Sequence, residues 1–192
     1  MCMDPIALLF LLPLLLGRRG GGGSKRFNKE RYKPGSLEQI ELFEAAAEHL
    51  GVPRSWAKSD SLKTLLWKES NGGWVGIPNY EYKSDRWGAN VSNPDNRGDW
   101  PGLWAHLRAG GEPPKGRGAT GLGQMILTNI PRHYPDGFQG IGDPWNEAVG
   151  MLSYINARWK SPDRAWECYK AGVCTSGVGI DGYGGPKNWS GY

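Results

Sequence analysis

Hydrophobic residues recur three and four positions apart in four stretches of the chain, which is the spacing of one face of an α-helix. Each stretch follows a residue that commonly caps a helix. The predicted helices run from Ser36 to Gly51, from Ser59 or Asp60 to Glu69, from Asp143 to Trp159, and from Ser161 to Gly172. In contrast, residues 72–118 are rich in glycine, proline and tryptophan and show no sustained period. We therefore expect a mainly α domain, with at most a small hairpin in this Trp-rich loop.

The first 33 residues differ from the rest of the chain in composition. An apolar run covers residues 6–16, and residues 17–33 carry seven basic side chains and one acidic side chain. The run is shorter than the ~20 residues that span a bilayer as a helix. The positive charges follow the run, whereas in a secretory signal they precede it. Residues 34–192 are close to neutral, with 16 basic and 17 acidic residues. We expect a hydrophobic tail and a Gly-rich basic linker over residues 1–33, and a globular domain over residues 34–192.

This N-terminal arm is expected to contact a partner. Residues 1–26 are interpreted as an anchor in a virion protein or on a membrane surface, with an unusual signal or anchor sequence as the alternative. The basic linker suits an anionic partner such as a membrane, the cell wall or nucleic acid, and nothing else in the sequence supports nucleic acid. A solvated linker without a partner is an equally weighted alternative.

The chain has three cysteines and no metal-binding pattern. Cys168 and Cys174 are six positions apart across the end of a predicted helix, so a disulfide between them is possible in an oxidising compartment. Two independent thiols fit the spacing equally well. Since neither cysteine nor histidine repeats at ligand spacing, we expect no metal site and no cofactor.

Glu69 occupies the fourth position of an apolar stripe in the second predicted helix, after Leu62, Leu65 and Leu66. A carboxylate that faces a core or cleft is disfavoured as an anion, so its pKa rises, and the helix dipole acts in the same direction at this C-terminal end. A protonated carboxylic acid can donate its proton to a glycosidic oxygen. By periodicity alone, an exposed glutamate at a helix end remains the more common case.

Four short blocks share their order and spacing with one known family. They are Trp67-Lys68-Glu69-Ser70-Asn71-Gly72, Gly118-Ala119-Thr120-Gly121-Leu122-Gly123-Gln124-Met125, Tyr154-Ile155 and Cys168-Tyr169-Lys170-Ala171-Gly172. Together they resemble the lytic transglycosylase (SLT) family, which is related to goose-type lysozymes. The family has a Glu-Ser pair, a Gly-Leu-x-Gln segment, a Tyr-Ile or Tyr-Leu pair and an Ala-Tyr-Asn-Ala-Gly segment. The resemblance covers roughly residues 62–172, and residues 119–154 are similar to phage and prophage members.

The resemblance implies a lysozyme-like (α+β) fold and cleavage of the bond between N-acetylmuramic acid and N-acetylglucosamine in peptidoglycan. Glu69 would protonate the bridging oxygen and then act as a base on the C6 hydroxyl, which gives a 1,6-anhydro product. Substrate contacts would come from Ser70, Gly121, Gly123, Gln124, Tyr154 and Tyr169. The two glycines equally mark a tight turn, and packing is the slightly preferred role of Tyr154. Lys170 replaces the family's asparagine, which puts that polar contact in doubt.

A hydrolytic lysozyme is the first alternative, with Glu69 assisted by a second carboxylate about 6.5–9.5 Å away that positions water. The Trp-rich loop offers three candidate helpers, Asp85, Asp95 and Asp99. Each stands where a turn residue is common, so chemistry by Glu69 alone is the preferred prediction. Tryptophans of the same loop either stack on sugar rings or pack in the core.

A phage particle is one setting for such an enzyme, where it would open a local hole in the cell wall during genome entry. The protein would then belong to the virion and act in the bacterial envelope. A catalytically weak, glycan-binding structural component of the virion is the second alternative. A membrane-associated wall-remodelling enzyme of the bacterial periplasm is the third.

Overall fold

The computed structural model describes residues 27–80, 85–88 and 98–171, and within them the chain is mainly helical. The α-helices are α1 (Leu37–Leu50), α2 (Asp60–Glu69), α3 (Trp100–Arg108), α4 (Ile130–His133), α5 (Pro144–Arg158) and α6 (Pro162–Ala171). Short 3-10 helices are η1 (Arg54–Lys58), η2 (Leu127–Asn129) and η3 (Gly137–Gly140). The strands are β1 (Pro78–Asn79), β2 (Ala119–Thr120) and β3 (Met125–Ile126). The prediction of a mainly α chain is confirmed, whereas the small hairpin, β2–β3, follows the Trp-rich loop and does not lie within it.

The four predicted helices are present and begin at their predicted caps. Before α1, the Ser36 hydroxyl accepts the Gln39 N–H at 3.2 Å, and Gly51 ends the helix in the left-handed conformation. The hydroxyl of Ser59 and the carboxylate of Asp143 play the same part before α2 and α5. These signals are local in sequence, which is why periodicity and capping residues located the helices.

Helix α3 was not predicted, because it lies inside the Trp-rich loop. Its start is defined by Asp99, whose carboxylate accepts the Gly102 N–H at 2.9 Å. Trp100, Leu103 and Leu107 form a buried stripe along its inner side. The helix is only nine residues long. Two and a half turns between glycine- and proline-rich stretches are too few for a sustained period, so the expectation of an irregular segment was wrong here.

The small sheet has the order β1-β2-β3 and is antiparallel throughout. Pro78 pairs with Thr120 on one side of the central strand, and Thr120 pairs with Met125 on the other. The tight hairpin therefore joins β2 to β3 through residues 121–124, and the Trp-rich loop contributes only the edge strand β1. This places the Gly-Leu-Gly-Gln segment at a turn that adjoins the chain following Glu69.

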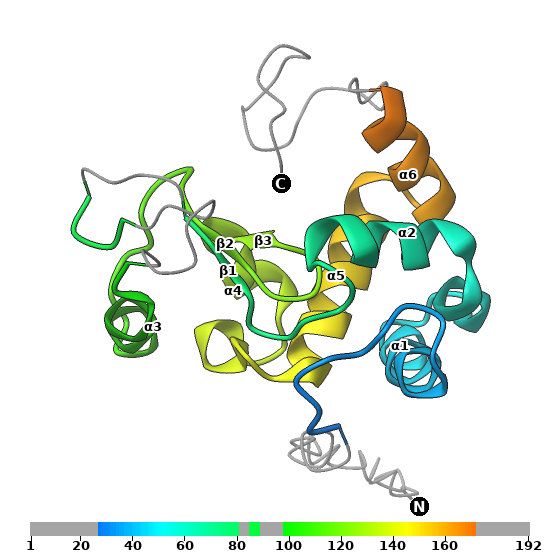
Figure 1. Ribbon diagram of the computed structural model, residues 1–192, viewed down its shortest axis with the longest axis horizontal. Helices are drawn as coiled ribbons and strands as arrows, with labels where there is room; N and C mark the ends of the chain where they lie inside the picture. The colour runs from blue at the N-terminus through cyan, green and yellow to red at the C-terminus, as the bar shows by residue number, and fades with distance from the viewer. Residues whose placement is uncertain (1–26, 81–84, 89–97, 172–192) are drawn as a thin grey trace, which may run out of the picture.

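Two apolar clusters stabilise the described part of the chain. One gathers side chains of α1, α2, α5 and α6, and the other gathers side chains of α3, η2, α4 and the chain around the sheet. In Figure 1, α1, α2 and α6 lie on one side of α5, and the sheet and α3 lie on the other side. Tyr154 of α5 packs against both clusters, so α5 connects them. Burial of each large aliphatic side chain contributes about 1.5–3 kcal/mol.

Part of the predicted linker packs against the domain. Phe27 and Tyr32 are 7% and 1% exposed and belong to the helical cluster. The Tyr32 N–H donates to the Gly73 carbonyl and the Val75 N–H donates to the Glu30 carbonyl, both at 2.7 Å. Residues 27–33 therefore support the loop that follows Glu69. Residues 1–26, which include Cys2, lie outside the described residues, and so does Cys174. Among the described residues, no helix has the length and apolar character needed to cross a membrane.

Candidate active site

Glu69 is the last residue of α2 and is partly buried. Its Oε1 atom is buried and has no hydrogen-bond partner among the described residues. Burial raises the pKa of the Glu69 carboxyl from 4.5 to about 8, because the charged form loses its hydration. The carboxyl is therefore held protonated at neutral pH, with one oxygen unoccupied by any described group.

Ser70 directs the chain away from the end of α2. Its buried hydroxyl donates to the Leu66 carbonyl at 2.9 Å and accepts the Gly73 N–H at 3.1 Å. Gly73 has φ +88°, and a Cβ there would stand 2.0 Å from the Tyr32 carbonyl oxygen. Ser70, predicted as a substrate contact, thus forms the turn that follows Glu69, and its hydroxyl proton is already donated within the protein.

Gln124 is 4% exposed and adopts an unusual backbone conformation, with φ +43°. Its Nε2 donates to the carbonyls of Ile77 at 2.9 Å and Gly121 at 3.1 Å. Two carbonyl acceptors fix the orientation of the amide, since only its nitrogen can donate to them. The Oε1 atom is buried and, among the described residues, has no donor. Gln124 therefore presents an unpartnered acceptor beside the segment that follows Glu69, and non-glycine strain of this kind concentrates at functional sites.

Gly121 and Gly123 form the turn between β2 and β3 and pack closely against α5. A Cβ on Gly121 would stand 2.6 Å from Glu147 Cδ, and the residue has φ +84°. A Cβ on Gly123 would stand 2.8 Å from Met151 Cγ. Both glycines are thus required by the tight turn and by its packing, the alternative already allowed by the sequence.

Tyr169 on α6 lies close enough to Glu69 to feel its charge. Burial raises the pKa of its hydroxyl, and the negative charge of Glu69 raises it further. Its ring stacks on that of Trp166, with centroids 5.5 Å apart. Ser61 on α2 donates to Asp163 on α6 at 2.5 Å, which holds the two helices together. Lys170, the departure from the family pattern, is exposed and lies over Trp166 instead.

Tyr154 on α5 is engaged in packing. Its ring makes edge contacts with His133 and Trp159, each with centroids 5.3 Å apart. Its hydroxyl accepts a hydrogen bond from Arg158. These contacts favour the packing interpretation of Tyr154 over the substrate contact.

The two described helper candidates both have other partners. Asp85 accepts the Tyr80 hydroxyl at 2.7 Å and an Arg117 N–H at 3.3 Å, and the Tyr80 bond is the main cause of its lowered pKa. Asp99 is the N-cap of α3. Asp95 lies outside the described residues. Asp85 and Asp99 therefore each have a structural role.

Sequence reasoning missed Glu147, which is completely buried in the first turns of α5. Its Oε1 accepts the N–H groups of Gly76 and Gly142, both at 2.9 Å, and its Oε2 accepts the Leu122 N–H at 3.0 Å. Burial raises the pKa of Glu147 to about 8, while the three backbone donors act in the opposite direction. The residue lies four positions before Met151 on the apolar stripe of α5, so the pattern that selected Glu69 also selects it.

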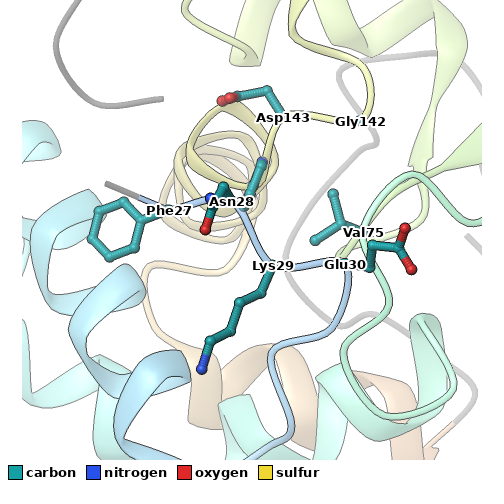
Figure 2. A pocket seen from close by; sticks show the side chains of 8 residues that line it. Phe27, Asn28, Lys29, Glu30, Val75, Gly142 and Asp143 are labelled. Atoms are coloured by element: carbon teal, nitrogen blue, oxygen red, sulfur yellow. The ribbon is translucent and has the colours of Figure 1, made fainter. Parts of the chain in front are cut away.

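A cavity of about 320 Å³ lies at the N-terminal end of α5 (Figure 2). It is lined by Phe27, Asn28, Lys29, Glu30, Val75, Gly142, Asp143 and Pro144. The Lys29 side chain points away from Asp143 and pairs with Glu38 on α1. None of the predicted site residues lines this cavity, so it carries no part of the candidate site.

The candidate site therefore consists of Glu69 on α2 and the nearby Tyr169 on α6, together with Gln124, whose turn is bonded to Ile77 in the chain that follows Glu69. No group of three acidic, histidine or cysteine side chains that could hold a metal occurs within the described part of the chain. No protein-family model, curated protein or solved structure matches the chain. The roles of these residues consequently rest on their geometry and on the resemblance of the four sequence blocks.

Proposed function

We propose that this chain is a lysozyme-like lytic transglycosylase that cleaves the glycan strands of peptidoglycan, with Glu69 as general acid and then general base. The observation that carries the proposal is the state of the Glu69 carboxyl. It has a buried oxygen without a partner among the described residues, and burial raises its pKa to about 8. A proton held at neutral pH on an unoccupied carboxyl is what protonation of a glycosidic oxygen requires.

The proposed reaction returns Glu69 to its starting state. Protonated Glu69 donates its proton to the oxygen between N-acetylmuramic acid C1 and N-acetylglucosamine C4 as the C1–O bond breaks, and the N-acetylglucosamine side leaves with a free 4-hydroxyl. The Glu69 carboxylate then removes the proton from the C6 hydroxyl of the muramic acid, whose oxygen bonds to C1. The products are the shortened strand and a 1,6-anhydro end, with no water consumed and no cofactor required.

Tyr169 and Gln124 are the two residues proposed to assist Glu69. The Tyr169 hydroxyl lies within the electrostatic influence of Glu69 and can stabilise the carboxylate after proton transfer. The fixed amide of Gln124 offers its free Oε1 to an N–H or hydroxyl group of a sugar. Both contributions need the two residues to stay in place, which their packing provides.

A hydrolytic lysozyme is the second candidate, and Asp85 is the observation that favours it. Its pKa is lowered, chiefly by the Tyr80 hydrogen bond, so Asp85 is ionised at neutral pH as a water-positioning base must be. Its carboxylate is nevertheless already bound to Tyr80 and Arg117. We therefore place transglycosylase chemistry first.

The proposed setting is a phage virion whose enzyme opens the cell wall locally during genome entry. Residues 1–26, with their apolar run, would hold the enzyme to a virion protein or a membrane, and the basic linker would face an anionic surface. A periplasmic enzyme of the bacterium itself is the alternative setting.

The test is to incubate the purified chain with peptidoglycan sacculi and to identify the released muropeptides by mass spectrometry. Anhydro-muropeptides are expected, and reducing ends would indicate the hydrolytic lysozyme instead. Glu69→Gln should lower the release at least about 100-fold while the fold is retained. Glu41→Gln, the same change on the exposed face of α1, is the matched control and should not alter it. If the wild-type chain binds sacculi and releases nothing, the protein is a glycan-binding component and the enzyme proposal fails.

A further inference from the structure

We infer that Glu147 is a positioning residue of this site, whose side chain fixes the loop following Glu69 against the turn that carries Gln124. The inference rests on the proposed function and extends it to a residue in the protein interior. Glu147 is completely buried, and its three bonded amides belong to Gly76, Leu122 and Gly142. One side chain thus joins two distant segments, 71 and 25 positions away in the sequence, to the loop just before its own helix.

Two of these segments belong to the candidate site. Gly76 lies seven residues after Glu69, and Leu122 lies two residues before Gln124. The segments are also joined directly, because the Ile77 carbonyl accepts both the Gln124 side-chain amide at 2.9 Å and the Gly121 N–H at 3.0 Å. If Gly76 lost its bond to Glu147, the adjoining Ile77 would therefore be free to move, and its carbonyl would no longer orient Gln124.

Glu147 cannot act on a substrate itself. Its Oε2 and the buried hydroxyl of Tyr134 both lie 2.8 Å from the point where a Cβ on Gly121 would stand. The carboxyl is thus enclosed by the β2–β3 turn on one side and by Tyr134 on another. Its effect on the reaction must pass through the segments that it holds, which distinguishes it from Glu69.

A glutamine at this position tests the inference whatever the protonation state of Glu147. A carboxyl oxygen keeps a lone pair for an N–H donor both as a carboxylate and as a protonated acid, whereas an amide nitrogen has none. Glu147→Gln therefore places a second donor against the Leu122 N–H, or against the N–H groups of Gly142 and Gly76, with almost no change in volume. A buried donor without an acceptor is unfavourable, so the affected segment is expected to shift.

The experiment compares wild type, Glu147→Gln and the matched surface change Glu41→Gln in the full chain. We would measure kcat and KM on soluble glycan strands well below the melting temperature of each protein, and amide hydrogen exchange by NMR. Glu147→Gln should lower kcat about 10- to 100-fold with KM changed by less than threefold, because misplacement of catalytic groups affects the chemical step. The Leu122 or Gly142 amide should lose protection, and Glu41→Gln should behave as wild type.

Each contrary outcome has its own meaning. If folded Glu147→Gln keeps the wild-type kcat, Glu147 serves stability alone and the inference is wrong, while the proposed function stands. If the variant does not fold, Glu147→Asp, which keeps both acceptor oxygens on a shorter side chain, replaces it, and an unchanged kcat there overturns the inference. If the wild type itself cuts no glycan, the proposed function fails and positioning for catalysis fails with it. Amide hydrogen exchange would still test the contacts of Glu147 in that case. Unprotected amides at Gly76, Leu122 and Gly142 in the wild type would disprove these contacts.

Discussion

The side-chain amide of Gln124 donates a 2.9 Å hydrogen bond to the carbonyl of Ile77, and this bond joins the β2–β3 turn to the chain that follows Glu69. The same amide donates to Gly121, so both of its protons have acceptors in the protein. These two bonds fix the direction in which the Oε1 atom points, and this atom has no donor among the described residues. The backbone of Gln124 has a positive φ. The orientation of Gln124, a proposed substrate contact, therefore depends on Ile77 in the chain that follows Glu69.

Gln124→Glu should therefore reduce activity strongly. A carboxylate in place of the amide cannot donate to the Ile77 and Gly121 carbonyls and would face them with like partial charges. We expect a loss of about 1–3 kcal/mol in the free energy of unfolding and a fall of about 10- to 100-fold in kcat/KM. Chemical denaturation and muropeptide release would measure the two effects.

Gln139→Glu is the matched control for this change. Its amide also donates to a backbone carbonyl, that of Arg108, but Gln139 is exposed and water can replace the bond. Its stability and activity should remain near those of wild type. Equal losses in the two variants would show that the Gln124 contacts have no special importance.

Glu69 should make the wild-type protein less stable at alkaline pH. The pKa of its carboxyl is about 8 in the folded chain and near 4.5 in the unfolded chain. The folded state therefore binds more protons between these values, so its stability falls as the pH rises from about 4.5 to 8 and stays low above that. Glu69→Gln removes this penalty.

We expect Glu69→Gln to be more stable than wild type by about 2–4 kcal/mol at pH 9, with the difference disappearing below pH 4.5. The other buried carboxyl, Glu147, is present in both proteins and cancels in the comparison. Urea denaturation across this pH range measures the difference. A variant that is less stable than wild type at pH 9 would contradict the burial of the Glu69 carboxyl.

The helices of this chain could be predicted because their signals are local. Ser36, Ser59 and Asp143 cap helices whose apolar residues recur within a few positions, so no knowledge of the tertiary structure was needed. Helix α3 is too short to be predicted in this way. Its stripe covers little more than two turns, and it is stabilised by burial of Trp100 and Leu103 in a cluster assembled from distant segments.

The site could be predicted only in part, and two glutamates show why, the partly buried Glu69 and the fully buried Glu147. Glu69 and Glu147 each occupy an apolar position of a helix, and periodicity does not distinguish them. Glu147 is satisfied by the N–H of Gly76, which is 71 positions away in the sequence, whereas a buried oxygen of Glu69 has no partner among the described residues. Only the tertiary structure supplies those donors, so the sequence pattern cannot separate a structural carboxyl from a candidate acid.

Activity should decline on the alkaline side with the titration of Glu69. A general acid must be protonated in the free enzyme, and the pKa of Glu69 is about 8. We therefore expect kcat/KM to fall about tenfold per pH unit above pH 8. Rate measurements from pH 5 to 10, with NMR titration of the Glu69 carboxyl carbon, would test this. Asp85→Asn should keep the same alkaline limb, and a wild-type limb near pH 5 would contradict the raised pKa of Glu69.

Tyr169 and Tyr154 should respond differently to removal of their hydroxyl groups. The Tyr169 hydroxyl lies near the charge of Glu69, whereas the Tyr154 hydroxyl accepts a bond from Arg158 and its ring is packed between His133 and Trp159. Tyr169→Phe keeps the ring that stacks on Trp166 and should lower kcat roughly tenfold or more, because a stabilising donor is lost.

Tyr154→Phe is the matched control, since it removes the same hydroxyl group from a tyrosine on α5. It should leave kcat within about twofold of wild type, because a single half-buried hydrogen bond contributes mainly to stability. Melting temperatures of both variants, together with kcat on soluble glycan strands, separate the two roles. A large loss of kcat in Tyr154→Phe with no loss in Tyr169→Phe would reverse the assignment and move the second polar contact of the site from α6 to α5.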